Sequence, residues 1–421
     1  MRADWNARAR EDANYYVAFG RRDQDDSEFL STAADVIRDL EGEIRRLPAE
    51  VPAAERRALE IGCGPGRLMR PMSRHFGEIH GIDVSDEMIA QAQRKLADIP
   101  WAHAHHASGS DLAQFPDDGF DFVYSYAVFQ HIPSAEVVFS YLREVVRVLK
   151  PGGFARLQIN GLPKTAKAYT TWEGVRIGAM EIHRFTGERG VRLLSLTGVE
   201  TQYMWTSWQK PPLAKAAEDM AHCRIRHVVN AFSGEQAVPS SGRLACVTLL
   251  IENLPEACDL NSLEALIDGV PGVGCYVGPR VNGLSQYNVF LPAGVRTGLV
   301  PVRILWRGER LCPDATIRVI PAGPAVPRLV SVSDGVNLLS TQRIESGTMK
   351  AAIEEVTSIG DFTATVDGVA VREVETFRTD PLPSRYEVNF ALPAGIAPGG
   401  HVLEIGLGKR RLVYMGIEVV A

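Results

Sequence analysis

The 421-residue sequence lacks several features that would identify whole classes of protein. It has no long block of basic residues, and its formal net charge of −6 argues against nucleic acid as the main partner. No stretch is long enough to span a membrane, and the N-terminal residues Met1 to Asn6 contain no apolar signal core. We therefore expect a cytoplasmic protein with neither a nucleic-acid nor a membrane partner.

Cysteine is scarce and is not arranged in metal-binding pairs. The chain has six cysteines without a Cys-x-x-Cys pair, which indicates neither a zinc ribbon nor a redox motif. Four of them fall in the C-terminal, β-rich part, where disulfides are the alternative to free thiols. His103, His105 and His106 alternate along an expected strand, but no cysteine or carboxylate pattern completes a site around them. We expect free thiols, exposed imidazoles and no metal.

The length and composition are those of a globular protein with more than one domain. A chain of 421 residues exceeds the usual size of one domain, and 45% apolar and 23% charged residues are ordinary proportions. Apolar residues recur with helical spacing from Asp26 to Leu47. Residues 1–50 are therefore predicted to form a helical arm or cap.

Residues 51–210 alternate apolar strands with helices. Such alternation predicts an α/β fold with a doubly wound, parallel sheet whose ligand lies at the carboxyl ends of the strands. Residues 161–200 fit the alternation poorly, which indicates either an insertion that faces the substrate or a surface excursion. The expected strands are Leu59–Gly62, Glu78–Val84, Trp101–His106, Phe120–Ala127, Phe154–Asn160 and a closing strand at Glu200–Trp208.

The C-terminal part consists of short β-like runs divided by Gly, Pro, Asn and Asp. Leu291-Pro-Ala-Gly294 recurs as Leu392-Pro-Ala-Gly395, and Asp268-Gly-Val recurs as Asp367-Gly-Val. A repeat of this length is one small domain rather than one turn of a solenoid. The repeated pattern is similar to bacterial immunoglobulin-like domains of the TIG type. This resemblance implies two all-β, immunoglobulin-like sandwiches at residues 243–321 and 322–421, after a connector at residues 211–242.

The stretch from Ala58 to Gly66, Ala-Leu-Glu-Ile-Gly-Cys-Gly-Pro-Gly, is a short apolar run that ends in three alternating glycines. Glycines adopt backbone angles that other residues avoid, and they let a ligand lie against the main chain. A helix that begins near Arg67 would point its positive N-terminal end at that ligand. The dinucleotide fingerprint G-x-G-x-x-G would require glycine at Arg67. An ordinary strand–helix turn is the alternative.

An acidic residue, Asp83, ends the second expected strand. A carboxylate at this position of a nucleotide-binding sheet accepts hydrogen bonds from ribose hydroxyls. The alternative is that Asp83 caps the next helix, but Ser85 already offers that cap.

The pattern E-x-G-x-G-x-G, with its acid at Glu60, resembles the first motif of class I S-adenosylmethionine-dependent methyltransferases of the type 11-like group. Residues Phe115 to Tyr126 resemble the fourth-strand motif of that family, and Leu149-Lys-Pro-Gly-Gly153 resembles its turn before strand five. The resemblance extends over about residues 30–210. It implies a methyltransferase domain at residues 51–210, a Rossmann-like sheet and S-adenosyl-L-methionine as cofactor.

The same resemblance assigns residues to parts of the cofactor. Glu60 would lie near the methionine ammonium, Asp83 near the ribose, and Ser125 and Tyr126 beside the methionine. Alignment on Asp111-Leu112 places Ser108 where the family often has the acid that contacts adenine, so Ser108, Gly109 and Asp111 all stay open for that contact. The predicted cofactor-binding residues are Glu60, Gly62, Cys63, Gly64, Gly66, Asp83, Val84, Ser108, Gly109, Ser110, Asp111 and Ser125.

The chemistry implied is transfer of a methyl group from a sulfonium, for which the protein mainly aligns donor and acceptor. An oxygen acceptor usually also needs a base. His131 is the best candidate, and Tyr126 and His183 are weaker ones. In many enzymes of this class an N-terminal segment closes over the cofactor, which makes Tyr15 and Tyr16 candidate lid residues.

The expected function is methyl transfer to an oxygen or nitrogen of a small molecule or saccharide. One alternative is a non-catalytic scaffold that binds S-adenosylmethionine and acts through its β domains. The other is an NAD-dependent oxidoreductase, which Arg67 and the Leu-Lys-Pro-Gly-Gly turn disfavour. The sequence indicates no oligomeric state.

Overall fold

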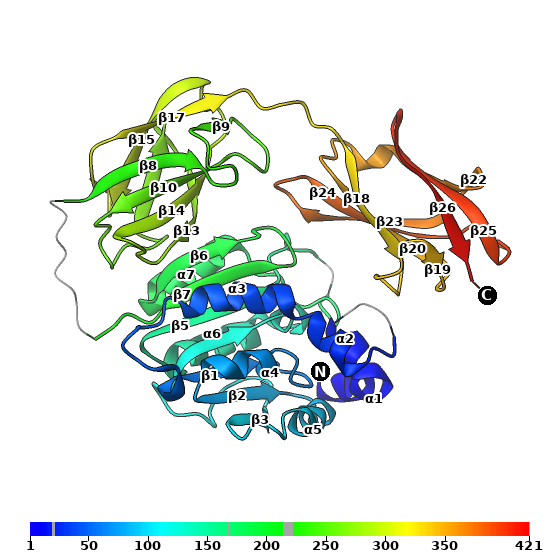
Figure 1. The fold of residues 1–421 in the computed structure, drawn as a ribbon, viewed down its shortest axis with the longest axis horizontal. Coiled ribbons are helices and arrows are strands. Elements are labelled where there is room, and N and C mark those ends of the chain that lie inside the picture. Colours follow the sequence, from blue (N-terminus) through cyan, green and yellow to red (C-terminus); the bar gives the residue numbers. More distant parts are fainter. Residues whose placement is uncertain (19–21, 167, 214–221, 421) are drawn as a thin grey trace. The chain divides into compact units, whose positions relative to one another are not determined.

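The computed structural model describes residues 1–18, 22–166, 168–213 and 222–420 (Figure 1). The chain forms two compact units. The first contains residues 1–7 and 33–323, and the second contains residues 8–32 and 324–421. The N-terminal helix α1 (Arg2–Ala18) contributes to both units and has non-helical backbone angles at Asp12.

The first unit is built on a parallel sheet. The strand order is β3-β2-β1-β4-β5, with all four neighbouring pairs parallel; β7 then adds antiparallel to β5, and β6 adds antiparallel to β7. This order confirms the predicted α/β, Rossmann-like fold. The strands are β1 (Arg57–Ile61), β2 (Glu78–Asp83), β3 (Ala102–His106), β4 (Phe120–Ser125), β5 (Leu149–Ile159), β6 (Arg192–Thr197) and β7 (Met204–Gln209).

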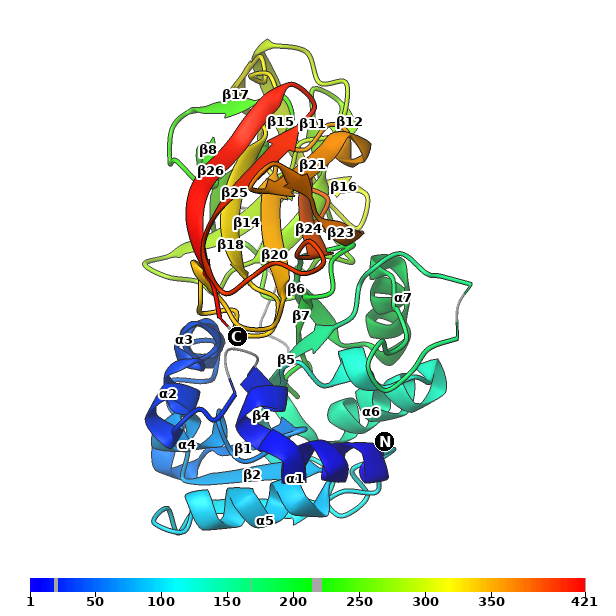
Figure 2. The ribbon, with the colours of Figure 1, turned by 90° about the vertical axis from the view of Figure 1, so that its right-hand side faces the viewer.

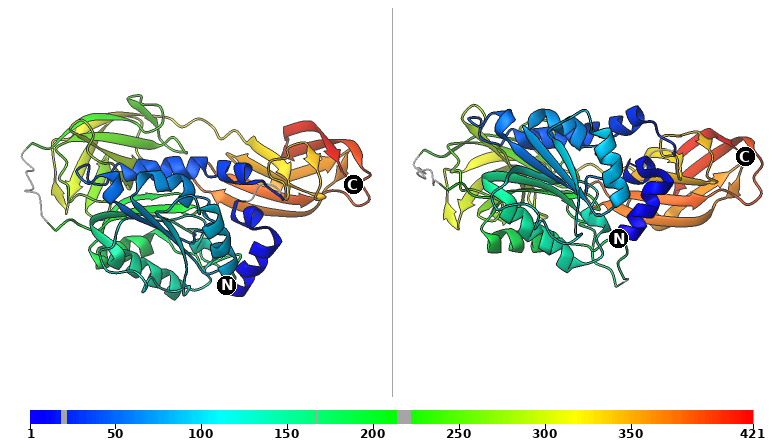
Figure 3. Two further views of the ribbon diagram at one scale, coloured as in Figure 1. Left: turned by 60° about the horizontal axis from the view of Figure 1, so that its bottom comes forward. Right: turned by 90° about the horizontal axis from the view of Figure 1, so that it is seen from below.

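Helices cover both faces of this sheet. Figure 3 shows α3 and α4 on one face and α6 and α7 on the other, and Figure 2 shows α5 running beside β2. The burial of α6 follows its sequence, because Val138, Leu142 and Val145 recur at helical spacing and are fully buried. The helices are α3 (Ala34–Ile44), α4 (Met69–Met72), α5 (Asp86–Lys95), α6 (Ala135–Val148) and α7 (Ala179–Arg189), with 3-10 turns η1 (Ala53–Glu55), η2 (Ser73–His75) and η3 (Phe129–His131).

Two sequence predictions about these elements are wrong. The helix expected over Asp26–Leu47 is interrupted: α2 (Asp26–Ser31) ends before α3 begins at Ala34. The predicted insertion at residues 161–200 contains α7 and β6, so the strand–helix alternation continues through it. The excursion is restricted to the residues before α7. Gly190, at φ 63°, ends α7, and β6 follows from Arg192.

The sheet continues beyond β6. β13 (Val273–Val277) pairs antiparallel with β6 at Tyr276 and Ser195, and the sheet extends through β14 (Leu284–Phe290), β10 (Cys246–Glu252) and β8 (Arg224–Asn230). Eleven strands therefore form one sheet. The first β-rich region, which runs from β8 to β17, shares its hydrophobic core with strands β1 to β7 and is not a separate compact unit.

The first β-rich region also begins earlier than predicted. β8 and β9 (Ala237–Pro239) lie within residues 211–242, which were predicted to be a connector; residues 214–221 of that connector lie outside the described chain. β8 is the outer strand of the sheet, and its exposed positions Arg224, Arg226 and His227 are polar. The alternation by which a half-buried strand is recognised is broken in β8, because a register shift leaves the consecutive residues Arg226 and His227 both exposed and the polar Asn230 is buried.

The internal repeat is a repeat of strand topology. In the first copy the sheets are β13-β14-β10-β8 and β12-β11-β15-β17-β9; in the second they are β23-β24-β20-β18 and β22-β21-β25-β26-β19, with the same parallel pairing between the last two strands. Both sheets of the second copy contribute to one core, so it is a sandwich. The remaining strands of the first copy are β11 (Leu263–Ile267), β12 (Val270–Pro271), β15 (Gly298–Trp306), β16 (Glu309–Arg310), which pairs with β15, and β17 (Ala315–Ile320). The strands of the second copy are β18 (Arg328–Asp334), β19 (Arg343–Ile344), β20 (Thr348–Glu354), β21 (Phe362–Val366), β22 (Val369–Ala370), β23 (Arg372–Asp380), β24 (Arg385–Ala391), β25 (Gly399–Leu407) and β26 (Arg410–Val419), with the 3-10 turn η4 (Ile359–Asp361) before β21.

Charge distinguishes the equivalent edge strands of the two copies. β13, with sequence VGCYV, has no charged residue and is covered by β6. β23 is the outer strand of its sheet in the described chain, is largely exposed and has two register irregularities. Charged side chains and bulges protect an edge strand from further pairing. The charged residues of β23 are Arg372, Glu373, Glu375, Arg378 and Asp380.

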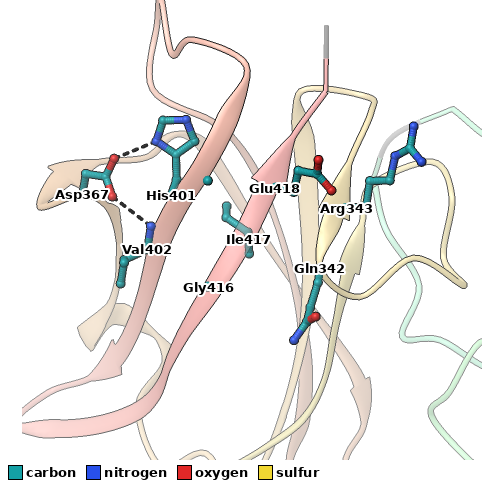
Figure 4. A pocket seen from close by; sticks show the side chains of 9 residues that line it. Gln342, Arg343, Asp367, His401, Val402, Gly416, Ile417 and Glu418 are labelled. Atoms are coloured by element: carbon teal, nitrogen blue, oxygen red, sulfur yellow. Dashed lines mark hydrogen bonds and ion pairs between the residues drawn. The ribbon is translucent and has the colours of Figure 1, made fainter.

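A shallow pocket lies on the second sandwich (Figure 4). His401 and Asp367 lie beside it, and His401 Nδ1 is 2.7 Å from Asp367 Oδ2. The other carboxylate oxygen, Oδ1, accepts a hydrogen bond from the Val402 amide at 2.8 Å. This exposed pair fixes the turn between β21 and β22 against β25.

The six cysteines all lie among the described residues, where they are buried and form no disulfide bond. Within the described ranges, no helix has both the length and the apolar character required to cross a membrane.

Candidate active site

The glycine turn follows β1 directly. Gly62, Gly64 and Gly66 have φ angles of 73°, 50° and 85°, which glycine adopts without strain and other residues avoid. The amides of Gly62 and Cys63 both donate to the Ile82 carbonyl, at 2.8 and 2.9 Å. A Cβ atom built on Gly62 would lie 2.2 Å from Val128 Cγ2. The turn therefore requires glycine both for its backbone angles and for the close approach of the loop after β4.

Asp83, at the end of β2, connects this turn to the next helix. Its Oδ2 accepts a hydrogen bond from the Gly64 amide at 3.0 Å, and its Oδ1 accepts one from the Ser85 amide at 2.8 Å. Ser85 Oγ accepts from the Met88 amide, so Ser85 is the cap of α5, as expected. Burial raises the pKa of Asp83, and the backbone amides act in the opposite direction.

Glu60 points from β1 into the protein and is 3% exposed. Its Oε2 accepts a hydrogen bond from the Tyr124 hydroxyl at 2.9 Å. Burial raises the pKa of Glu60 to about 8, although the Tyr124 hydrogen bond and the charge of Arg67 lower it. A cation beside such a carboxyl group stabilises its ionised form. Glu60 is therefore suited to bind an ammonium group.

The turn after β3 holds the candidates for adenine recognition. Ser108 Oγ accepts from the amides of Ser110 and Asp111 at 3.2 and 3.3 Å, and Asp111 Oδ1 accepts from the Ala113 amide at 3.1 Å. The hydrogen bond from the Ala113 amide lowers the pKa of Asp111, which is therefore an anion at neutral pH. A Cβ on Gly109 would lie 3.2 Å from Val84 Cγ2. The polar side chains thus stabilise the turn, and their contact with adenine stays a prediction.

The end of β4 carries Ser125 and Tyr126. Ser125 Oγ donates to the Ile61 carbonyl at 2.9 Å, which ties β4 to β1 just before the glycine turn. The Tyr126 ring stacks on Trp205, with centroids 5.6 Å apart, and the Arg67 guanidinium lies 5.7 Å from the centroid of the Tyr126 ring. Burial raises the pKa of Tyr126 above its usual value of 10.0, so its hydroxyl is protonated at neutral pH. Deprotonating Tyr126 for use as a base would therefore be costly.

His131 is buried in η3, just after β4. Its Nδ1 lies 3.1 Å from the Thr171 carbonyl and its Nε2 lies 3.3 Å from Gln130 Nε2. A proton on Nδ1 satisfies the carbonyl and leaves Nε2 as the acceptor of the Gln130 amide. Gln130 is in turn held by Gln158, which donates to its Oε1 at 3.2 Å. An acceptor that uses His131 as a base would have to replace the Gln130 amide.

His183, a weaker candidate base, lies on α7 and faces the first β-rich region. Its Nδ1 is 2.8 Å from Asn261 Oδ1. His131, by contrast, contacts Gln130, Thr171 and Trp172, among other residues.

Residues 2–6, which sequence analysis missed, contact the loops at the carboxyl ends of the strands. Arg2 Nη2 donates to both oxygens of Asp86, at 2.7 and 2.8 Å. Asn6 Oδ1 accepts from Ser85 Oγ at 2.6 Å. These contacts fix the N-terminus beside the loop that carries Asp83.

The same segment also contacts the loop between β5 and α7. Asp4 Oδ2 accepts a hydrogen bond from Thr171 Oγ1 at 2.5 Å. The Trp5 ring meets His131 edge-on, with centroids 5.2 Å apart, and Trp172 lies 6.0 Å from the same imidazole. Residues 2–6 therefore bridge the Asp83 side and the His131 side of the sheet edge. The predicted lid residues Tyr15 and Tyr16 belong to the second unit.

The histidines of β3 form a cluster with β2. His80 Nδ1 lies 3.1 Å from His105 Nε2, and His80 Nε2 lies 3.0 Å from Glu78 Oε1. His106 Nε2 lies 3.4 Å from Asp86 Oδ1. Over the described ranges, no three His, Cys, Asp or Glu side chains are grouped so that they could hold a metal ion.

Comparison with known proteins identifies the central part of the first unit. Residues 59–157 match a family model described as a methyltransferase domain. The chain is 36% identical over 105 residues to phosphoethanolamine N-methyltransferase 2 of Caenorhabditis elegans, covering 24% of this chain and 23% of that protein. It is 31% identical over 161 residues to malonyl-[acyl-carrier protein] O-methyltransferase of Enterobacter lignolyticus, covering 36% and 57%.

A solved structure of phosphoethanolamine N-methyltransferase 2 of Haemonchus contortus with S-adenosyl-L-methionine is 22% identical, with a TM-score of 0.32 and coverage of 38% of each chain. The chain thus spans between about a quarter and somewhat over half of the curated relatives named here. Their names include both nitrogen and oxygen acceptors, so they do not identify one acceptor for this chain. Over residues 59–157, the chain carries a methyltransferase domain whose cofactor is S-adenosylmethionine.

Proposed function

We propose that this chain is an enzyme that transfers the methyl group of S-adenosylmethionine to an oxygen or nitrogen of a small molecule or saccharide. The observation that supports this most strongly is the convergence of three backbone-fixed features at one edge of the sheet. They are the glycine turn, the Asp83 carboxylate bound to the Gly64 and Ser85 amides, and the buried Glu60. A nucleoside with an amino-acid tail matches this arrangement, because the ribose needs acceptors and the ammonium needs an anion.

The residues present fit that cofactor. A Cβ on Gly62 would collide with Val128, so this position has no room for a side chain, and a glycine here places no side chain between the backbone and a ligand. When bound, the cofactor supplies an electrophilic methyl group on a sulfonium. In our proposal, Asp83 binds the ribose hydroxyls, Glu60 neutralises the ammonium, and Ser125 holds the ends of β1 and β4 together.

The protein's contribution to the reaction is alignment and exclusion of water. In our proposal, residues 2–6 and the Thr171 loop cover the reacting groups. Fixing donor and acceptor in one geometry can lower the activation free energy by about 7–11 kcal/mol at most. For an oxygen acceptor, His131 would take the proton at Nε2, the nitrogen that now faces Gln130. For an amine acceptor that arrives neutral, no base is needed before the methyl group moves.

The test is calorimetric titration of the full chain with S-adenosylmethionine, S-adenosylhomocysteine and NAD. We expect the first two compounds to bind, and we expect Asp83→Ala to weaken binding at least about tenfold, because it removes a charged hydrogen-bond acceptor. Asp35→Ala is the matched control, since the Asp35 side chain is 91% exposed and pairs with Arg38 at the surface. Binding of NAD alone would favour the oxidoreductase. Cofactor binding without S-adenosylhomocysteine formation across an acceptor screen would favour the scaffold.

A further inference from the structure

Glu60 and Tyr124 form a buried pair across the two central strands. They are direct register partners in β1 and β4, so both side chains leave the sheet on the same face. Tyr124 is fully buried and its hydroxyl donates to Glu60 Oε2 at 2.9 Å. Among the described residues, that hydrogen bond occupies one carboxylate oxygen and leaves Oε1 for another partner.

The electrostatic surroundings give the tyrosine hydroxyl a defined role. The charged and titratable groups that face Glu60 are Tyr124 on β4, Arg67 and Cys63 beside the glycine turn, and Asp83 on β2. Burial raises the pKa of the Tyr124 phenol well above 10.0, so the phenol is a hydrogen-bond donor at every relevant pH. A permanent donor stabilises the charged form of the carboxyl group against desolvation and against the negative charge of Asp83.

We propose that Tyr124 is a positioning residue, whose hydroxyl holds the Glu60 carboxylate charged and turned so that Oε1 meets the ammonium of the bound methionine portion. This assignment rests on the proposed function, since it needs S-adenosylmethionine to be the ligand. It extends that function to a residue that contacts Glu60 rather than the cofactor. Loss of the hydroxyl should harm recognition of the amino-acid end and spare recognition of the nucleoside.

The test compares two ligands that share the nucleoside. S-Adenosylmethionine carries the ammonium, whereas 5′-methylthioadenosine lacks the amino-acid portion. For Tyr124→Phe at pH 7 we expect about tenfold weaker binding of S-adenosylmethionine, because a hydrogen bond to a charged group is lost. Binding of 5′-methylthioadenosine should change less than about twofold.

A control variant separates this role from general loss of a buried hydroxyl. Tyr287→Phe removes a similarly buried tyrosine hydroxyl from the first sandwich, where it faces the Leu263 carbonyl at 3.5 Å, and should leave both affinities unchanged. If Tyr124→Phe fails to fold, Glu60→Gln provides the second test. It keeps an oxygen acceptor for Tyr124 but removes the charge, so its loss of affinity should be selective for S-adenosylmethionine.

Two results would overturn the assignment while leaving the proposed function intact. One is an equal loss of affinity for both ligands, and the other is an unchanged affinity of Tyr124→Phe for S-adenosylmethionine. Either result would mean that the hydroxyl only supports the fold. Wild-type protein that binds neither ligand would instead overturn the proposed function, and this assignment with it.

Discussion

Arg46 offers a direct test of the junction between the catalytic sheet and the first sandwich. It follows α3, and its Nε donates to Glu43 Oε2 at 2.6 Å. Its Nη1 donates to the Val277 carbonyl on β13 at 2.9 Å, and its guanidinium lies 5.0 Å from the centroid of the Tyr276 ring. The Arg46 and Glu43 side chains are only 4% and 8% exposed, so this ion pair is shielded from water.

Replacing Arg46 with alanine should destabilise the first unit strongly. The change leaves the Glu43 carboxylate buried without its cation and removes the donor to the Val277 carbonyl. Breaking a buried ion pair on one side costs about 3–5 kcal/mol, which is a large part of the roughly 5–15 kcal/mol that holds a typical domain together. We expect the urea midpoint of Arg46→Ala to fall accordingly, with unfolding followed by tryptophan fluorescence and circular dichroism.

A double-mutant cycle separates the two contributions. The double variant Glu43→Ala/Arg46→Ala removes the unpaired Glu43 carboxylate, so part of the stability lost in Arg46→Ala should return. The difference in unfolding free energy between the double variant and Glu43→Ala then measures the contacts of Arg46 with β13. Arg38→Ala is the surface control, because its ion pair is largely exposed and should contribute about 0–1 kcal/mol. A loss below about 1 kcal/mol for Arg46→Ala would refute the buried junction.

Two further predictions follow from local geometry. Gly62→Ala should lower the free energy of unfolding by about 2 kcal/mol or more, because it combines a left-handed backbone with a clash against Val128. Gly42→Ala in helix α3 is the control, and it should be neutral or stabilising because the space around Gly42 is open. Equal stability of the two variants in urea unfolding would contradict this prediction. His401 should titrate above the usual 6.5 in proton NMR, since its Asp367 partner raises the pKa of the imidazole, and Asp367→Asn should return it towards 6.5. Because the pKa of His401 is raised and that of Asp367 is lowered, the pair should stabilise the turn at mildly acidic pH; its contribution is lost as the pH rises through the His401 pKa or falls through the Asp367 pKa.

The parallel sheet of the first unit was predictable from the sequence, because the signals that indicate it are local. Period-two and period-3.6 patterns, the Ser85 cap and the three glycines each reflect backbone geometry within a few residues. The repeat at Leu291 and Leu392 was likewise visible, and it corresponds to two copies of one strand order. Where a register shift and a buried polar residue broke the alternation, as in β8, the same local reasoning missed the strand.

Tertiary structure alone decided which distant residues meet. β13 pairs with β6 because both strands have an unpaired edge and β13 has no charged residue to prevent pairing. Sequence periodicity predicts a strand but not its partner. The placement of Asp4 and Trp5 against Thr171 and His131 is equally non-local. The hydrogen bond between Glu60 and Tyr124 exists because the register of β1 and β4 brings them opposite each other, and register is fixed by packing of the whole sheet rather than by either strand.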